Sequence, residues 1–541
     1  MKLGADSKKP EGGAVVRFRN DIDSAKAGDR RQELISSLDS DEFDQRYTVT
    51  TPTKENRYRL WPEQVTAEYR QWPRVVDLSA TPPSNGLMEK RGGALIDIDS
   101  HALGARIKAY LDSDISWEVL AAQHPSGLTR DAARFKAKAA RSKVKASKEY
   151  GDYSQSNLRR YAVRPFDHQW CYYIGERPVW NEPRPALWAQ AWDGNSFFLS
   201  RLRSSSGAEG VPCYFVDCLS DDHLIVPDAS CFPVRLRKKP NAKKSPPGAM
   251  LLFNDEADDA ELTVANLSKK SRVYLHSLGI ANPDANEEIA GLIWMHALAI
   301  GHAPAYLSEN ADGVEQNWPR VPLPANRESL QASAKLGSVV ASLVNAPSLG
   351  SAQTIATAPG TGVEGVTQGK IRHELEFLGM IERSGGGALS SADLRVTAGW
   401  GHHGRKGVTA PGKGRVVERD YSEKELEALG TGVTMIGLTI DQALSRLGHS
   451  TRDIYLNDAA FWKNVPSRVW DFRVGGYQVI KKWLSYRDND LLGRVLTLEE
   501  AEYVTEITRR IAALLLLGQA LDANYANAKT NVYDWGALLT A

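Results

Sequence analysis

Cysteine is scarce in this sequence, with four residues in a chain of 541. That scarcity excludes a disulfide-stapled secreted scaffold and predicts a reduced, cytoplasmic compartment. The sequence also lacks a large net charge, since 67 Lys and Arg are balanced by 66 Asp and Glu. A uniformly basic nucleic-acid coat is therefore excluded. The apolar stretch 511–518 is too short to span a membrane, and residues 1–13 carry no secretory signal.

Motifs of several common enzyme classes are absent as well. The sequence has no zinc-protease or nucleophile-elbow motif, and the Gly-rich stretch 360–369 lacks the Lys-Ser/Thr of a phosphate loop. Adenine methylation needs an Asn/Asp-Pro-Pro-aromatic turn, because the side chain must accept a hydrogen bond from the flipped adenine. Here Pro82-Pro83 stands between Thr81 and Ser84. We therefore predict no catalytic residue and no bound S-adenosylmethionine in this chain.

Three of the four cysteines lie close to a histidine, as Cys213, Cys218, His223 and Cys231. Their spacing matches no common zinc pattern closely. Cys213 and Cys218 belong to an apolar, strand-like run, in which a free cysteine packs as a small hydrophobic residue. Zinc binding and core packing are the two interpretations, and we predict core packing and no metal site.

Local patterns predict an α+β protein of several domains, with short strands and a helical C-terminal region. Strands are expected at 14–21, 94–99, 170–174, 196–202, 211–219, 231–237, 393–401 and 414–421. Helices are expected at 30–38, 101–112, 128–148, 286–303 and 328–344, and from a Thr497–Glu500 capping box onwards. Turns and loops are expected at 81–86, 235–244, 254–261, 309–324, 345–369 and 401–415. These patterns divide the chain into a disordered segment 1–13 and regions 14–127, 128–345 and 346–541.

Positive charge is concentrated between Leu128 and Arg164, where 11 Lys and Arg and 3 Asp and Glu give 11 − 3 = +8. A helix with Thr129 as its N-cap would present many of these cations together. Such a run is either a solvated helix face or a contact with nucleic-acid phosphates. The candidate DNA-binding residues in and beside it are Arg134, Lys136, Lys138, Arg141, Lys145, Arg159, Arg160, Arg164 and Asp167.

Two further cationic segments lie in the last third of the chain. Lys481 and Lys482 follow Gly475-Gly476 on a predicted helix, where they either contact phosphate or are solvated. The Gly-rich loop 401–415 suits phosphate contact, and its two adjacent histidines are either phosphate ligands or part of a polar turn. The candidate DNA-binding residues of this loop are Arg405, Lys406, Lys413 and Arg415.

Several segments resemble, in the same order, blocks of the type ISP DNA methyltransferase and restriction enzymes. They are RYRLW (57–61), GLMEKRGGALIDID (86–99), RYAVRPFDHQWCYY (160–173), VTAGWG (396–401), GKGRVVERDY (412–421) and VWDFRVGGYQVIKKWLSYR (469–487). RPFD and GGYQVIKKWL are the most specific pieces. The resemblance runs over nearly the whole chain and concerns the specificity half of that family, after its methyltransferase.

The resemblance implies a coupling region at 14–127, a target recognition domain with a basic helix and a β-rich core at 128–345, and a C-terminal specificity domain at 346–541. It implies a specificity subunit that binds double-stranded DNA in an adenine-specific restriction-modification or phage-defence system. The implied partners are a methyltransferase catalytic subunit, which would bind S-adenosylmethionine, and other subunits of the defence system. No association with a membrane is expected. Two alternatives remain open. In the first, the chain is the functional part of a split N6-adenine methyltransferase whose active site is shared across the interface. In the second, it is a non-catalytic scaffold of a defence complex.

The RPFD segment itself has two interpretations. A target recognition module needs cations for phosphates and a few side chains aimed at base edges. Arg164 and Asp167 flank a Pro-Phe turn in the most basic part of the chain. They either contact bases or pair with each other to fix the turn.

Overall fold

The computed structural model describes residues 16–22, 25–38, 40, 43–53, 58, 60–62, 64–204, 210–238, 262–345, 375–404 and 409–537. The chain divides into two compact units, residues 1–67 and 68–541. In the first unit, β1 (Val16–Phe18) pairs antiparallel with β2 (Thr48–Thr50), and α1 (Ala27–Ser37) and α2 (Phe43–Arg46) lie between them in sequence. The helix predicted at 30–38 and part of the strand predicted at 14–21 are therefore confirmed.

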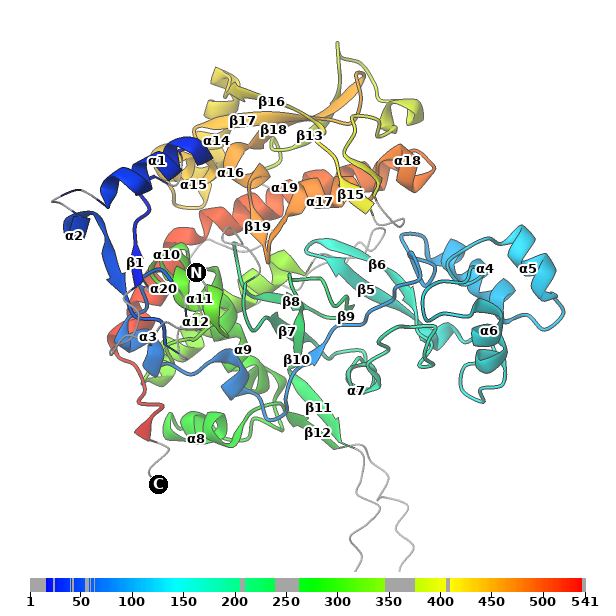
Figure 1. Cartoon of the computed structure of the whole chain (residues 1–541), viewed down its shortest axis with the longest axis horizontal. Coiled ribbons are helices and arrows are strands. Elements are labelled where there is room, and N and C mark those ends of the chain that lie inside the picture. The colour runs from blue at the N-terminus through cyan, green and yellow to red at the C-terminus, as the bar shows by residue number, and fades with distance from the viewer. Residues whose placement is uncertain are drawn as a thin grey trace, which may run out of the picture. The chain divides into compact units, whose positions relative to one another are not determined.

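The second unit begins with short elements and a four-stranded sheet (Figure 1). Short helices α3 (Ala67–Gln71) and η1 (Val75–Leu78) precede the sheet, whose strand order is β4 (Ile96–Asp97), β6 (Asp167–Tyr172), β5 (Leu158–Arg164) and β9 (Leu219–Ser220). β5 and β6 form an antiparallel hairpin, whereas β9 runs parallel to β5. The helices of this part are α4 (Ser100–Leu111), α5 (Trp117–Gln123), α6 (Ala137–Lys145), η2 (Gln155–Asn157) and α7 (Pro185–Trp188).

A second sheet packs against buried helices. Its strand order is β3 (Ser84–Asn85), β10 (Ser230–Pro233), β7 (Phe197–Ser200) and β8 (Tyr214–Val216), and β11 (Arg235–Lys238) pairs with β12 (Leu262–Ala265). Trp294 of α9 (Glu287–His302) lies 5.4 Å from the rings of both Phe198 and Phe232, which joins that helix to the sheet. The neighbouring helices are α8 (Lys269–Ser277), α10 (Pro304–Glu309), α11 (Ala311–Gln316) and α12 (Arg327–Val344).

Helices α9 and α12 approach each other closely, and both confirm the helices predicted at 286–303 and 328–344. A Cβ atom on Gly337 of α12 would lie 1.9 Å from the carbonyl oxygen of Met295 on α9. Glycine is therefore required at this crossing. His296 ties the same pair, because its ring nitrogens lie 2.7 Å from the Ser333 hydroxyl and 2.8 Å from the Pro322 carbonyl oxygen.

The last third of the chain is built on an antiparallel sheet with the order β13 (Met380–Arg383), β18 (Ala460–Pro466), β17 (Ser450–Tyr455) and β16 (Arg415–Asp420). Two small hairpins, β14 (Gly401–His403) with β15 (Thr409–Pro411) and β19 (Arg473–Val474) with β20 (Tyr477–Gln478), accompany it. The helical elements are η3 (Ser391–Leu394), α14 (Glu423–Met435), α15 (Ile440–Leu447), α16 (Ser467–Trp470), α17 (Val479–Ser485), α18 (Asn489–Leu492), α19 (Leu498–Leu516) and α20 (Gly518–Thr530). The α+β class is confirmed.

Helix α19 connects these parts of the second unit. It begins at the predicted Thr497–Glu500 capping box, in which each side chain bonds the other residue's backbone N–H. The Trp462 ring of β18 donates to the carbonyl oxygen of Ala501 at 3.0 Å. Farther along α19, Arg510 donates to the carbonyl oxygens of Ser342 and Leu343 at the end of α12. Sheet β13–β18 and the α9–α12 helices therefore share one supporting helix.

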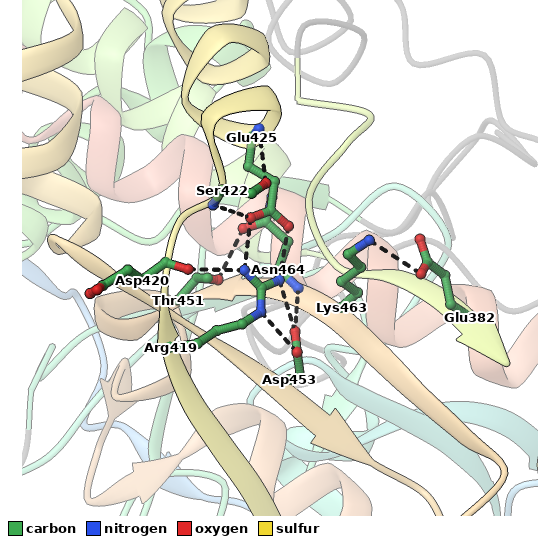
Figure 2. A network of polar contacts seen from close by, with 9 residues as sticks. All are labelled: Glu382, Arg419, Asp420, Ser422, Glu425, Thr451, Asp453, Lys463 and Asn464. Carbon is green, nitrogen blue, oxygen red and sulfur yellow. Dashed lines mark hydrogen bonds and ion pairs between the residues drawn. The ribbon is translucent and has the colours of Figure 1, made fainter. Parts of the chain in front are cut away.

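A polar network fastens α14 to the strands of this sheet (Figure 2). Arg419 of β16 donates to both carboxylate oxygens of Glu425 at 2.8 Å and to Asp453 of β17 at 2.9 and 3.1 Å. Glu425 also accepts from the backbone N–H of Ser422, which closes the N-terminal capping box of α14. Every nitrogen of the Arg419 guanidinium is therefore engaged inside the protein.

The helix predicted at 128–148 is too long, because α6 covers only Ala137–Lys145. Thr129 is not its N-cap. Its hydroxyl donates to the carbonyl oxygen of Ser126 in a preceding turn. Ala132 and Phe135 then exchange backbone hydrogen bonds, and Arg134 between them has a φ of 62°. Burial of the Phe135 side chain holds this turn, so tertiary packing overrides the helix propensity of the segment.

Several other predicted boundaries are corrected. Of the strand predicted at 393–401 only Gly401 is in a strand, as the first residue of β14, because the side chain of Asn457 holds the carbonyl oxygens of Asp393 and Arg395 in an irregular segment. The single strands predicted at 211–219 and 231–237 are each divided between two sheets, and only Ile96–Asp97 of 94–99 is a strand. Regular elements also occur in the predicted loops, as β3 in 81–86, β11 in 235–244, α11 in 309–324 and β14 and β15 in 401–415. The predicted acidic loop 254–261 and nearly all of the linker 345–369 lie outside the described residues.

The cysteine thiols lie in separate surroundings. Cys213 is buried and its sulfur lies 3.9 Å from the Ser200 hydroxyl, whereas the Cys231 sulfur lies 3.0 Å from the Ser220 hydroxyl. Burial raises the pKa of both thiols to about 12. This arrangement agrees with the core packing predicted for these residues. Among the described residues, no helix is both long and apolar enough to cross a membrane.

Candidate nucleic-acid interface

The RPFD segment forms the tight turn between β5 and β6. Phe166 has a φ of 60°, in the left-handed region that a bulky side chain rarely adopts. Its backbone N–H donates to the Tyr214 hydroxyl at 2.8 Å, and its carbonyl oxygen accepts from the Tyr503 hydroxyl at 2.7 Å. Two buried tyrosines from other parts of the chain therefore hold this strained turn in one conformation.

Asp167 at the end of the turn is fixed by a buried ion pair. Both of its carboxylate oxygens accept from Arg487, at 2.7 and 3.1 Å, and the two side chains are 1% and 0% exposed. The Arg487 guanidinium also lies 3.7 Å from the centre of the Trp483 ring. The interpretation in which Asp167 pairs with Arg164 to fix the turn is therefore wrong. The two residues face each other across the β5–β6 ladder, but their side chains have different partners.

Arg164 pairs instead with Asp221, 57 residues later in the sequence. Its Nη1 donates to Asp221 Oδ1 at 2.7 Å, and both side chains are about one-seventh exposed, at 16% and 14%. Tyr161 donates to the other oxygen of Asp221 at 3.1 Å, and the backbone N–H of His223 donates to Oδ1. Burial lowers the pKa of Arg164, but the attraction of Asp221 outweighs it and raises the pKa overall. Arg164 is thus a fixed cation.

A second cation and two tyrosines complete this cluster. Lys482 of α17 places its Nζ 4.5 Å from the ring centre of Tyr486 and 5.6 Å from that of Tyr477. The Arg164 guanidinium lies 5.3 Å and 5.8 Å from the rings of Tyr477 and Tyr486. We call Arg164, Asp221, Tyr477, Lys482 and Tyr486 the Arg164 cluster.

The β19–β20 hairpin brings Tyr477 to this place. Gly475 in its turn has a φ of 51°, and a Cβ atom there would lie 2.5 Å from a methyl carbon of Ile225. The Val226 N–H donates to the carbonyl oxygen of Gly475 at 3.0 Å. Glycine is therefore required for the hairpin to approach the loop after β9, which carries Asp221.

Lys482 differs from a solvated lysine in its environment. No described residue accepts a hydrogen bond from its ammonium group or lies within ion-pair distance of it. Burial, together with repulsion by Arg164, lowers the pKa of Lys482 to about 8, while Asp167 acts in the opposite direction. Since the side chain is only partly exposed, it carries a charge near neutral pH with little water to solvate it. Such a group favours an anionic or electron-rich ligand.

Three of the cations on and around α6 that were predicted to bind DNA have hydrogen-bonding partners among the described residues, unlike Lys482. Lys136 and Lys138 are exposed and pair with Asp131 and Glu118 at 3.0 and 3.1 Å. Arg141 is buried, and its guanidinium donates to the carbonyl oxygens of Tyr110, Asp112 and Ile115. We therefore correct the expectation for Arg141, because a guanidinium used in this way holds the α4–α5 connection and cannot reach a phosphate.

The remaining predicted residues of the first half lie on the surface or along β5. Arg134 is exposed in the turn before α6, and Lys145 is partly exposed at the end of that helix. Arg159 of β5 lies 3.6 Å from Asp193 and over the Trp188 ring, whereas Arg160 is partly exposed on the same strand. None of these residues belongs to the Arg164 cluster.

In the second half, Arg415 begins β16 and Lys413 lies two residues before it, away from the Arg164 cluster in sequence. Both are exposed, and Arg415 pairs with Asp458 at 2.6 Å and lies over the Tyr455 ring. Arg405 and Lys406 lie outside the described residues. Lys481 is partly exposed beside Lys482 on α17, as predicted from the helix pattern.

Sequence reasoning missed Asp221, Tyr486 and Arg487 as members of the site or its support. Arg487 lies 320 residues after its partner Asp167, and no local pattern connects residues that far apart. A weak signal existed at Asp221, since an Asp-Asp-His run interrupts an otherwise strand-like stretch. Within GGYQVIKKWLSYR, the helical spacing of Tyr486 four residues after Lys482 was a second signal.

The model of the Type ISP C-terminal specificity domain matches residues 82–511. Because this match covers most of the chain, the protein belongs to the family of Type ISP C-terminal specificity domains. Comparison with curated proteins gives no significant match.

Solved structures similar to this chain include a nuclease-deletion mutant of the Type ISP restriction-modification enzyme LlaGI in complex with a DNA substrate mimic (14% identity, 92% of this chain and 38% of that one, TM-score 0.48). The ATP-dependent Type ISP enzyme LlaBIII bound to DNA is 12% identical over 89% of this chain and 26% of that one, with a TM-score of 0.47. A DrdV–DNA complex is 13% identical over 88% of this chain and 40% of that one, with a TM-score of 0.49. The chain spans less than half the length of each of these proteins.

Proposed function

We propose that this specificity domain reads a DNA target sequence and presents one adenine to a methyltransferase catalytic partner. The Arg164 cluster is the observation that carries the proposal. It joins two cations and two tyrosines on a rigid support, and neither Arg164 Nη2 nor Lys482 Nζ donates to a residue that the structure describes. S-adenosylmethionine would bind to the partner, and the cytoplasmic location predicted from the sequence belongs to the same proposal.

The chemistry of the cluster suits base and backbone recognition together. Arg164 uses Nη1 for Asp221, and its Nη2 makes no hydrogen bond to a described residue. The Nη2 of an arginine held at a fixed angle can donate to an acceptor on a base edge, such as O6 or N7 of guanine, whereas an ammonium such as that of Lys482 suits a phosphate. Tyrosine rings offer a surface on which an unstacked base can lie.

The support of the cluster is as important as its members. A base contact must be held within a fraction of an ångström, so the side chain should come from a rigid element. Arg164 ends β5, directly before a turn that is held by Tyr214, Tyr503 and the buried Asp167–Arg487 pair. A turn held this firmly can present one side chain to a groove.

Competition binding over a randomised duplex library tests the proposal. Arg164→Ala should relax the preference at one base position, which corresponds to about 1–3 kcal/mol of discrimination. Arg452→Ala is the matched control, because Arg452 is 17% exposed and also ion-paired, but lies in the β16–β18 sheet. If both variants keep the wild-type preference, the reading surface lies elsewhere.

Titration with S-adenosylmethionine separates this proposal from the two alternatives. The chain alone should give no saturable binding and no DNA methylation, and methylation should require a catalytic partner. Saturable binding by the chain alone would support a split methyltransferase with a shared active site. A chain without sequence preference that still assembles with defence proteins would be a scaffold.

A further inference from the structure

A second polar site lies on the loop after β9, directly beyond Asp221. Asp222, His223 and Asp228 each offer one ligand atom, and these atoms all lie within 4.8 Å of one another. The site lies outside the proposed base contacts, because none of the three side chains belongs to the Arg164 cluster. It is also distinct from the cysteines, since Cys213 and Cys231 point to separate partners in the core.

Asp222 is the residue of this site whose buried carboxylate lacks a donor among the described residues. The residue is 1% exposed, and its fully buried Oδ1 accepts no hydrogen bond from the described part of the chain. No described residue donates to its other oxygen. Burial is the main cause that raises the pKa of this carboxyl, with His223 acting against it and Asp228 adding to it, to about 6 overall. Carboxylates in protein interiors are paired, hydrogen-bonded or bound to a cation.

The distances suit a shared cation better than a direct contact. His223 Nδ1 lies 3.9 Å from Asp222 Oδ2, which is too long for a hydrogen bond. Two ligands that each lie about 2.0–2.2 Å from a zinc ion are roughly 3.5 Å apart in tetrahedral geometry. His223 and Asp228 are exposed, so small side-chain rotations would bring all three ligand atoms to such distances.

The backbone of the loop is already fixed without a cation. The Asp222 N–H donates to the carbonyl oxygen of Leu87 at 2.9 Å, and the Ala229 N–H donates to the carbonyl oxygen of Asp222 at 2.7 Å. These bonds close the loop at both ends of the ligand set. The ordering cost of binding an ion is therefore confined to two side chains.

The charges around the site favour a cation. Asp222 and Asp228 are both acidic, and the neighbouring Asp221 is neutralised by Arg164. Arg184 is the nearby positive group that acts on Asp222, and its own charge is partly offset by Glu182 at 3.5 Å. Among the described residues, neither Asp222 nor Asp228 is paired with a lysine or arginine, and the His223 ring lies 3.9 Å from Asp222.

We propose that Asp222, His223 and Asp228 bind a divalent transition-metal ion of the zinc type, with water at the open positions. An imidazole nitrogen beside two carboxylates favours zinc over magnesium, which prefers oxygen ligands and keeps much of its water. The bound ion would remove the repulsion between the two aspartates. It would also brace the loop that carries Asp221, the partner of Arg164.

Calorimetric titration and thermal melting of the full, tag-free chain after EDTA treatment test this inference with zinc chloride and magnesium chloride. We expect one zinc per chain, a higher melting temperature with zinc, and little response to magnesium. Asp228→Asn and His223→Ala change exposed residues, so both should fold, and each should weaken zinc binding by about tenfold or more. Asp217→Asn, at an exposed aspartate before β9, is the matched control and should bind as wild type.

Asp222→Asn gives a second readout that a purely structural role would not produce. The amide removes a buried, unpartnered charge, so the metal-free variant should melt at the same temperature as wild type or higher. It should also lose the zinc-dependent rise. The inference is overturned if wild type binds no zinc, or if the three ligand variants bind it as tightly as the Asp217→Asn control. DNA plays no part in these measurements, so their outcome is independent of the proposed function.

Discussion

Arg419 and Arg164 each lie near the end of a β-strand, yet the structure uses them differently. Arg419 donates to Glu425, to Asp453 and to the carbonyl oxygen of Asp420, so all three of its nitrogens are engaged (Figure 2). Toward the residues that the structure describes, Arg164 donates through Nη1 alone, to Asp221 and to the carbonyl oxygen of Val163. A saturated guanidinium holds a fold together, whereas an unsaturated one beside Lys482 and two tyrosines has capacity left for a ligand.

The same contrast separates the two arginines in their effects on stability. Removing a saturated, partly buried arginine leaves several carboxylate oxygens without donors. Removing Arg164 leaves Asp221, which still accepts from Tyr161 and from the backbone of His223. Stability measurements and DNA-binding measurements should therefore rank the arginines of this chain in opposite orders.

The largest loss of stability is expected from Arg487→Ala. This change leaves the carboxylate of Asp167 buried and unpaired beneath the RPFD turn, which should cost about 3–5 kcal/mol of unfolding free energy. Urea denaturation measures it, with Arg468→Ala on the surface as the control. A loss below about 1 kcal/mol, within the range of an exposed ion pair, would contradict the buried pair.

Arg419→Ala should have the next largest effect on stability, about 1–3 kcal/mol, because its hydrogen bonds are to charged groups. Burial raises the pKa of Glu425, but the bonds from Arg419 and Ser422 lower it to about 2 overall. A lowered pKa stabilises the fold above the unfolded value near 4.3, and this contribution is lost as the pH falls toward 2. The difference between wild type and Arg419→Ala should therefore shrink between about pH 5 and pH 3 in denaturation series. A constant difference would contradict the role of Glu425.

The sequence predicts the elements whose signals are local. Helices α9, α12 and α19 follow from apolar spacing and capping residues such as Thr497 and Glu500. The strand β16 and the helix that carries Lys482 follow in the same way. The family, too, is evident in short motifs, and the match to the specificity-domain model confirms it.

What the sequence does not predict depends on contacts between distant residues. The turn before α6 exists because Phe135 is buried, and the irregular segment before β14 exists because Asn457 reaches back to it. In the sequence, Arg141 and Lys138 are equivalent cations of one basic run. In the structure, Arg141 is buried, whereas Lys138 is exposed and pairs with Glu118. Likewise, Asp167 and Arg164 look like partners in RPFD, and only the fold assigns them to Arg487 and Asp221.

Lys482 should make DNA binding depend on pH. Its pKa of about 8 means that the free chain loses this charge as the pH rises above 8, whereas bound phosphate would retain the proton. The affinity should therefore be nearly constant below about pH 7.5 and fall by up to about tenfold per pH unit above pH 8. Lys482→Arg keeps the charge and should remove this dependence. Fluorescence anisotropy from pH 6.5 to 9.5 measures it, and an equal decline in both proteins would assign the effect to another group.

The smallest effect is expected at α6, whose cations have acidic neighbours. Lys136, Lys138 and Lys143 are exposed and pair with carboxylates at 3.0, 3.1 and 2.8 Å. Exposed pairs of this kind contribute about 0–1 kcal/mol each, so the triple alanine variant should fold normally. Each phosphate contact contributes about −0.9 to the slope of log affinity against log salt.

We expect the triple variant to change that slope by less than the contribution of one phosphate, and Lys482→Ala to change it by about that amount. Duplex binding measured at several salt concentrations distinguishes the two. If the triple variant instead flattens the salt slope by the contribution of two or more phosphate contacts, α6 contacts the phosphate backbone. The pairs with Glu118 and Glu176 would then be contacts that DNA displaces, and the basic run would act together with the Arg164 cluster.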